Sequence, residues 1–146
     1  MIFPSNIRKA VAMWVLEAGT GVGPLSLGMT EDQSRAILGP VSSIFRRTPE
    51  STEDVIAYDV AGVHLTVDQE RRVRQISVFP PNEVCLSGVQ LLGRKVAEVA
   101  TDMKTTRFRF QSVDAGLWCP AANVLLVEVD GMVDGVEIGP LSGCPS

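Results

Sequence analysis

The stretch GVGPLSLGMTEDQSRAILGP, residues 21–40, holds the strongest local signals of the chain. Thr30 followed three residues later by Gln33 forms a capping box, in which each side chain reaches the other residue's backbone N–H. Acidic residues come next, where the helix dipole favours negative charge. Gly39, which readily takes a left-handed conformation, is followed by proline and ends the pattern. The stretch therefore predicts one short helix, about Glu31–Leu38.

The glycines in front of this helix also raise the question of a phosphate-binding loop. No strand pattern precedes them, and no Gly-Lys-Ser/Thr follows them. Glu31 and Asp32 occupy the helix N-terminus, where their charge would repel a phosphate. We therefore interpret the stretch as a well-capped helix and not as a nucleotide site.

The segment before it, residues 5–18, has apolar residues at helical spacing, with Ser5 as a possible cap and Gly19 as a possible end. This spacing predicts an N-terminal helix with Trp14 in the core. The apolar run inside the segment is too short for a secretory signal or a membrane span.

Segments rich in β-branched residues follow the predicted short helix and predict an antiparallel meander. They cover residues 43–47, 55–60, 63–67 and 73–79. A second helical pattern within residues 87–103 is followed by strand-like segments at 107–113, 124–129 and 135–138. In the first of these, the alternation RFRF (107–110) predicts two arginines on one face of a strand and two phenylalanines on the other.

The same order of elements therefore occurs twice, and short sequence blocks align between the two occurrences. Leu27-Gly28 matches Leu92-Gly93, VHLTVD (63–68) matches LLVEVD (125–130), and VRQISVFP (73–80) matches VDGVEIGP (133–140). We predict an α+β fold in one compact body. It would consist of an N-terminal helix (1–20) and two repeated units (21–82 and 83–146), each a short helix plus a three- to four-stranded antiparallel meander.

Composition limits the classes of partner. The 146 residues are 45% hydrophobic and carry a net charge of −4, which suits a folded protein but not one with nucleic acid as its main partner. A basic protein partner fits the acidic charge. The three cysteines, Cys85, Cys119 and Cys144, form no CxxC motif and favour a reducing cytoplasm. A single pair such as Cys119 with Cys144 remains open.

Residues typical of catalysis or metal binding are sparse. His64 is the only histidine, and it alternates with the apolar Val63 and Leu65 in a strand pattern, which favours a half-exposed strand residue over a general base. No zinc or serine-hydrolase motif occurs. Acid pairs such as Asp130 and Asp134 suit a turn. We expect no catalytic residue, no metal and no cofactor.

The part of the first stretch from Leu27 to Pro40 resembles a signature of small α+β modules of the BamE/SmpA outer-membrane lipoprotein type. The matching residues are Met29-Thr30 and Leu38-Gly39-Pro40. Two such modules in tandem also resemble the architecture of the β-lactamase inhibitory protein. The resemblance implies a binding module without catalysis. Neither a lipobox nor a signal peptide is recognised, so the resemblance does not extend to an envelope location.

We therefore expect a non-enzymatic protein-binding module of a bacterial cytoplasm, such as an immunity or inhibitor protein that neutralises a basic, toxin-like partner. The candidate partner-binding residues are one tryptophan, a residue type enriched at binding hot spots, and four acids that suit a basic partner. They are Trp118, Glu53, Asp54, Asp59 and Asp114. Two alternatives remain. One is a small-ligand-binding protein or enzyme with a pocket between two sheets, using acids, His64 or Cys119. The other is a scaffold component of a larger assembly.

Overall fold

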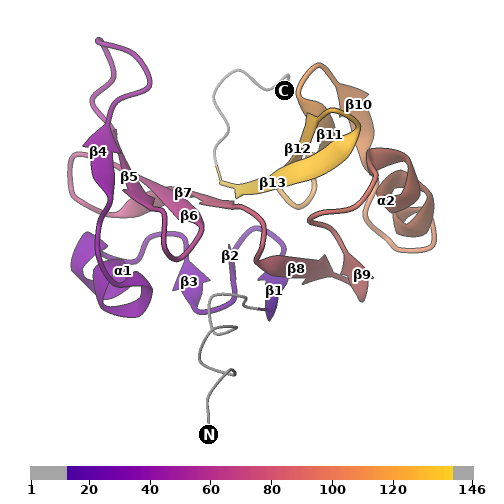
Figure 1. Cartoon of the computed structure of the whole chain (residues 1–146), viewed down its shortest axis with the longest axis horizontal. Coiled ribbons are helices and arrows are strands. Elements are labelled where there is room, and N and C mark those ends of the chain that lie inside the picture. Colours follow the sequence, from indigo (N-terminus) through magenta and orange to yellow (C-terminus); the bar gives the residue numbers. More distant parts are fainter. Residues whose placement is uncertain (1–12, 140–146) are drawn as a thin grey trace, which may run out of the picture.

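The computed structural model describes residues 13–139, in which thirteen strands form two sheets and two helices lie beside them (Figure 1). This part of the chain is mostly β. The predicted fold, an N-terminal helix followed by two helix-plus-meander units, is therefore wrong. Both meanders belong to one sheet, and short strands that the sequence pattern did not reveal build a second sheet.

The larger sheet has eight antiparallel strands in the order β10-β11-β12-β13-β7-β6-β5-β4. The first meander consists of β4 (Ser43–Phe45), β5 (Asp54–Tyr58), β6 (Val63–Val67) and β7 (Val73–Val78). The second consists of β10 (Gln111–Val113), β11 (Gly116–Cys119), β12 (Val124–Val129) and β13 (Met132–Ile138). At the centre β7 pairs with β13, with Ile76 opposite Ile138 and Val78 opposite Val136. This pairing joins two meanders that are distant in sequence into one continuous sheet.

The smaller sheet has five strands in the order β3-β2-β1-β8-β9. They are β1 (Met13–Glu17), β2 (Gly21–Val22), β3 (Leu25–Ser26), β8 (Glu83–Leu86) and β9 (Val89–Gln90). β1 pairs in parallel with β8 and antiparallel with β2.

β1 lies where the sequence predicted the end of an N-terminal helix. Residues 5–12 of that helix lie outside the described residues, residues 13–17 are extended, and Ala18 begins a turn. Along β1 the exposed Met13 and Val15 alternate with Trp14, which packs against the core, and with the buried Leu16. Because strands on both sides supply its backbone hydrogen bonds, this short segment forms a strand although its apolar spacing also suits a helix.

The two helices are α1 (Glu31–Leu38) and α2 (Val96–Met103). α1 has the predicted bounds, and its predicted capping box is present: Gln33 N–H donates to Thr30 Oγ1 at 3.1 Å, and Thr30 N–H donates to Gln33 Oε1 at 2.9 Å. Gly39 has a φ of +87° at the C-terminal end. α2 has no side-chain cap at its N-terminus; its N-cap residue, Lys95, is instead paired with Met132 of β13 through a backbone bridge.

The turns that lead into the two helices are bonded to the larger sheet by the same pattern of backbone hydrogen bonds. Gly28 N–H donates to the carbonyl of Val73 at 2.7 Å, and Gly93 N–H donates to the carbonyl of Val133 at 2.9 Å. Val73 and Val133 donate in return to the carbonyls of Met29 and Arg94. Each helix is thereby held against the last strand of the meander that follows it.

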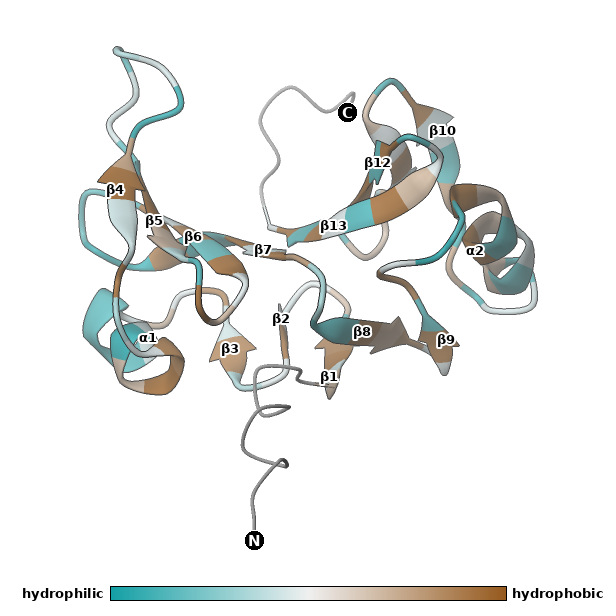
Figure 2. Ribbon diagram, viewed as in Figure 1, coloured by the Kyte–Doolittle hydropathy of each residue, from teal (hydrophilic) through white to brown (hydrophobic). Residues whose placement is uncertain are grey.

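The hydrophobic core lies between the larger sheet and the layer formed by α1, α2 and the smaller sheet (Figure 1). Large, fully buried side chains from both layers meet there, including Tyr58, Leu65, Leu126, Leu25 and Met103. The loop between β4 and β5 extends away from this core and is hydrophilic (Figure 2). Residues 107–110, expected to begin a strand, precede β10 as an irregular segment. The predicted alternation is nevertheless present in their exposure, because Arg107 and Arg109 are exposed whereas Phe108 and Phe110 pack against the core.

Candidate functional site

The face of the eight-stranded sheet that points away from the core carries one side chain from every strand in a single transverse row. Cross-strand pairing places these eight residues next to one another. In order from β4 to β10 they are Ser43, Ala57, His64, Ser77, Glu137, Leu125, Trp118 and Gln111. A neighbouring row holds Phe45, Val55, Thr66 and Gln75. We call these twelve residues the concave face, because the sheet curves with β4 and β10 at its raised ends (Figure 1).

The concave face is separate from the core. Strand residues alternate between two faces, and the alternate set, such as Ile56, Leu65 and Ile76, belongs to the core cluster. Val55 and Leu125 are also buried but lie outside that cluster. The two faces of the sheet therefore have different roles, and only the core face packs against the helices.

An aromatic group surrounds His64 on this face. The His64 ring makes edge contacts with Phe79 at 4.8 Å and with Phe45 at 6.0 Å between ring centroids. His64 Nε2 lies 3.5 Å from Asp59 Oδ1, and the His64 side chain is 30% exposed. Phe45 is 42% exposed. The group therefore presents aromatic surface to the outside, with one carboxylate beside it.

A polar group crosses the sheet beside it. Arg47 Nη2 lies 3.4 Å from Thr66 Oγ1 and 3.5 Å from Gln75 Oε1, and Gln75 Nε2 donates to Glu137 Oε1 at 3.2 Å. Burial raises the pKa of the half-buried Glu137 above its usual 4.5, while the charges of Arg47 and His64 lower it in part. Within residues 13–139 the amide of Gln75 is the one group that donates to this half-buried carboxylate, so its loss of hydration is only partly offset. A partner that supplies a donor here would relieve this cost.

Two shallow depressions adjoin these groups. One, of about 280 Å³, is lined by Asp59, His64 and Phe79 together with Gly62, Val63 and Pro80. The other, of about 130 Å³, lies under the β4–β5 loop and is lined by Arg47, Glu53 and Gln75 among others. Both are smaller than most small-molecule sites, whose volumes are about 300–1,000 Å³.

The structure separates the five residues that the sequence singled out. Glu53 lines the depression under the β4–β5 loop and pairs with Arg74 at 2.9 Å. Asp59 lies beside His64 at the opposite end of β5. Trp118 lies in the row on β11, but it is buried, with its Nε1 unpaired. Asp114 is exposed in the turn between β10 and β11. Glu53 and Asp59 therefore border the concave face, whereas Trp118 is part of its floor and Asp114 lies at its far end.

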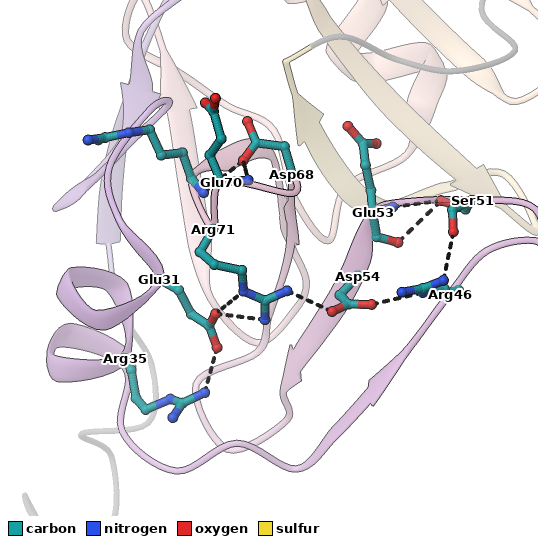
Figure 3. Close-up of polar contacts among 10 residues, drawn as sticks. Glu31, Arg35, Arg46, Ser51, Glu53, Asp54, Asp68, Glu70 and Arg71 are labelled. Atoms are coloured by element: carbon teal, nitrogen blue, oxygen red, sulfur yellow. Dashed lines mark hydrogen bonds and ion pairs between the residues drawn. The ribbon is translucent and has the colours of Figure 1, made fainter.

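Asp54 belongs instead to an ion network on the helix side (Figure 3). Its carboxylate accepts from Arg71 at 2.7 Å and from Arg46 at 3.1 Å. These contacts hold the pKa of Asp54 below its usual value, with the Arg71 bond as the largest cause. Arg71 also bonds Glu31 on α1. Asp54 is thus engaged in holding α1 to the sheet, not presented to a partner.

Sequence reasoning missed four residues of this site: Phe45, Arg47, Gln75 and Glu137. A usable signal was present for two of them, because Gln75 and Glu137 are polar residues inside strands that are otherwise mostly apolar. The placement of His64 on the face opposite Val63 and Leu65 is confirmed.

Within residues 13–139 no three His, Cys, Asp or Glu side chains are grouped closely enough to hold a metal ion. Cys85 and Cys119 are free thiols, and Cys144 lies outside the described residues. Neither of the two described helices has the length and apolar character needed to cross a membrane. No protein-family model, no curated protein and no solved structure matches the chain.

Proposed function

We propose that this protein is a non-enzymatic binding module that holds a partner protein on its concave face, as an inhibitor or immunity protein does. The observation that carries the proposal is the transverse row of eight side chains, one from every strand. Seven spacings of about 4.8 Å make such a row about 34 Å wide along the sheet. Seven of the twelve residues of the concave face are buried, so the contact surface lies mainly on the other five, Ser43, Phe45, His64, Glu137 and Gln111.

The chemistry of the face supports a protein partner. Protein interfaces favour aromatic and arginine side chains around a small apolar centre. The concave face has Phe45 and His64 exposed in part, Arg47 beside them, and the small Val55 and Ala57 as a floor. Its residues lie on paired strands, so little conformational entropy is lost when a partner binds.

We further propose that the partner is basic and toxin-like. The net charge of −4 would attract such a partner and raise the association rate at low salt. Asp59 is exposed at the border of the face, and Glu137 lies half-buried at its centre. A lysine or arginine of the partner could pair with either.

The test is capture of partners from the native host, identification by mass spectrometry, and reconstitution of the complex with the purified partner. Phe45→Glu places a charge on the concave face, and Ile37→Glu places the same charge at an equally exposed position on α1, since the two side chains are 42% and 44% exposed. We expect Phe45→Glu to weaken the reconstituted complex at least tenfold and Ile37→Glu to change its Kd less than twofold.

Equal retention of the partner by the two variants would overturn the assignment of this face. Failure to recover any stoichiometric protein complex with the unmodified chain would overturn the binding function itself. The alternative of a small-ligand-binding protein or enzyme with a pocket between two sheets stays a prediction, although the two meanders are joined edge to edge by β7 and β13 and do not form separate sheets.

A further inference from the structure

We infer that the cavity between α2 and β11 is a second binding site, which takes a medium-chain amphiphile with a carboxylate head. The cavity has a volume of about 350 Å³. It lies on the core side of the sheet, because its strand residues Ser112 and Leu117 alternate with Gln111 and Trp118 of the concave face. It is therefore independent of the proposed partner-binding face.

The walls of this cavity are mostly apolar. They are formed by Ala100 and Met103 of α2, Phe108 and Phe110 of the segment before β10, and Leu117 of β11. Met103, Phe108 and Leu117 are each less than a tenth exposed, so they form the floor of the cavity. A volume near the lower limit for small-molecule sites, with apolar walls, suits a short alkyl chain better than a polar metabolite.

Positive charge is concentrated at the same place. The segment KTTRFR, residues 104–109, has three cations and no acid in a chain whose net charge is −4. Lys104 and Arg109 line the cavity. Among residues 13–139, no ion pair joins Lys104, Arg107 or Arg109 to a carboxylate. The nearby Asp102 is already bonded to Arg94 at 2.8 Å.

Contacts within the segment 104–109 and with the end of α2 engage only some of the donors of its three cations. Lys104 follows the last turn of α2, where a cation is favoured by the helix dipole. Among the described residues, Arg109 donates only from Nη1 to the carbonyl of Thr106, which leaves its other donors available there. Arg107 stacks over the Phe108 ring at 4.9 Å. Arginine donors match a carboxylate in a forked geometry, so Arg109 with Lys104 can hold an anionic head while the alkyl chain lies along Met103 and Leu117.

Decanoate is the probe, and isothermal titration calorimetry of the full chain is the measurement. We expect saturable binding at one site, and decyltrimethylammonium, which has the same chain length and the opposite charge, should bind at least tenfold more weakly. Arg109→Gln should weaken decanoate about tenfold, the size expected for one lost hydrogen bond to a charged group. Lys104→Gln should weaken decanoate binding, whereas Lys95→Gln at the other end of α2 should leave it within twofold.

Filling the cavity provides the second test. Ala100→Leu extends into the space, and Ala97→Leu makes the same change on the exposed side of the same helix. Leucine is a good helix former, so both variants should fold, which circular dichroism verifies. We expect Ala100→Leu to abolish decanoate binding and Ala97→Leu to preserve it. The proposal is overturned if decanoate does not bind, if the cationic amphiphile binds equally well, or if Ala100→Leu binds as the unmodified chain does.

Discussion

Arg71 and Glu31, forty residues apart in the chain, are joined by two contacts of 2.7 Å, from Arg71 Nε and Nη2 to Glu31 Oε1 (Figure 3). The same guanidinium reaches Asp54 Oδ2 at 2.7 Å through Nη1. One side chain in the β6–β7 turn therefore connects α1 to β5. Both carboxylates are largely shielded, with side-chain exposures of 13% and 21%.

We expect Arg71→Ala to lower the free energy of unfolding by about 1 kcal/mol, because a shielded network exceeds the few tenths expected of an isolated surface pair. Urea unfolding followed by circular dichroism measures it. The control is Arg35→Ala, which removes a single i,i+4 pair with Glu31 within α1, leaves the contacts between α1 and β5 in place, and should cost less than about 0.5 kcal/mol. Equal losses in the two variants would show that Arg71 does not connect the two elements.

The lowered pKa of Asp54 predicts a pH dependence of stability. A carboxyl whose folded pKa lies below its unfolded value of about 3.8 stabilises the fold above that value, and the contribution is lost as the pH falls through the folded pKa. The urea midpoint of Asp54→Asn should therefore lie below that of the unmodified protein at pH 7. The gap should close as the pH is lowered below about 4. A gap that stays constant from pH 7 to pH 3 would contradict this.

The raised pKa of Glu137 predicts a pH dependence of stability opposite in sign to that of Asp54. Its pKa is raised by burial, so the unfolded state releases this proton first and stability falls as the pH rises from 4.5 through the folded pKa. Glu137→Gln removes the charge and keeps an oxygen that can accept from Gln75. We expect the variant to have a higher melting temperature than the unmodified protein at pH 7 and an equal one near pH 3. Destabilisation at pH 7 would show that the carboxylate is better compensated than its contacts indicate.

Adding a side chain at Gly116 should destabilise the sheet strongly at the contact between β11 and β12. A Cβ at this position would lie 2.0 Å from the carbonyl oxygen of Leu126 on the paired strand, and φ is +148°. Gly116→Ala should lower the free energy of unfolding by about 3 kcal/mol or more, because β11 must move away from β12. Gly131→Ala is the control: its φ is +81°, but no atom lies within 4 Å, so it should cost only about 1 kcal/mol of backbone strain. Denaturant unfolding compares the two.

Local signals predicted the elements whose own residues favour the backbone conformation that they adopt. α1 was predicted correctly because Thr30 and Gln33 cap each other, and β6 and β12 because their β-branched residues favour extended backbone. β2, β3 and β9 were missed. Each is two residues long and exists only because a neighbouring strand supplies its hydrogen bonds.

The candidate site was likewise predictable only where a feature depends on neighbouring residues in the sequence. Alternation in VHLTV was enough to place His64 on the face opposite Val63 and Leu65. It could not bring His64 into line with Glu137 and Trp118, because that requires β7 to pair with β13 across two distant meanders. The sequence pattern also could not show that Asp54 and its neighbour Glu53 lie on opposite faces of the sheet and bond different arginines.

The sequence by itself determined the capped helix, the strongest strands and the acidic charge, since these depend on neighbouring residues and on composition. Only the tertiary structure decided that MWVLE is a strand, that two meanders form one sheet, and that eight side chains make one concave face. The physical reason is that a strand leaves its backbone donors and acceptors to be satisfied by partners elsewhere in the chain. Its neighbours, and therefore its face, depend on pairings that no local pattern encodes.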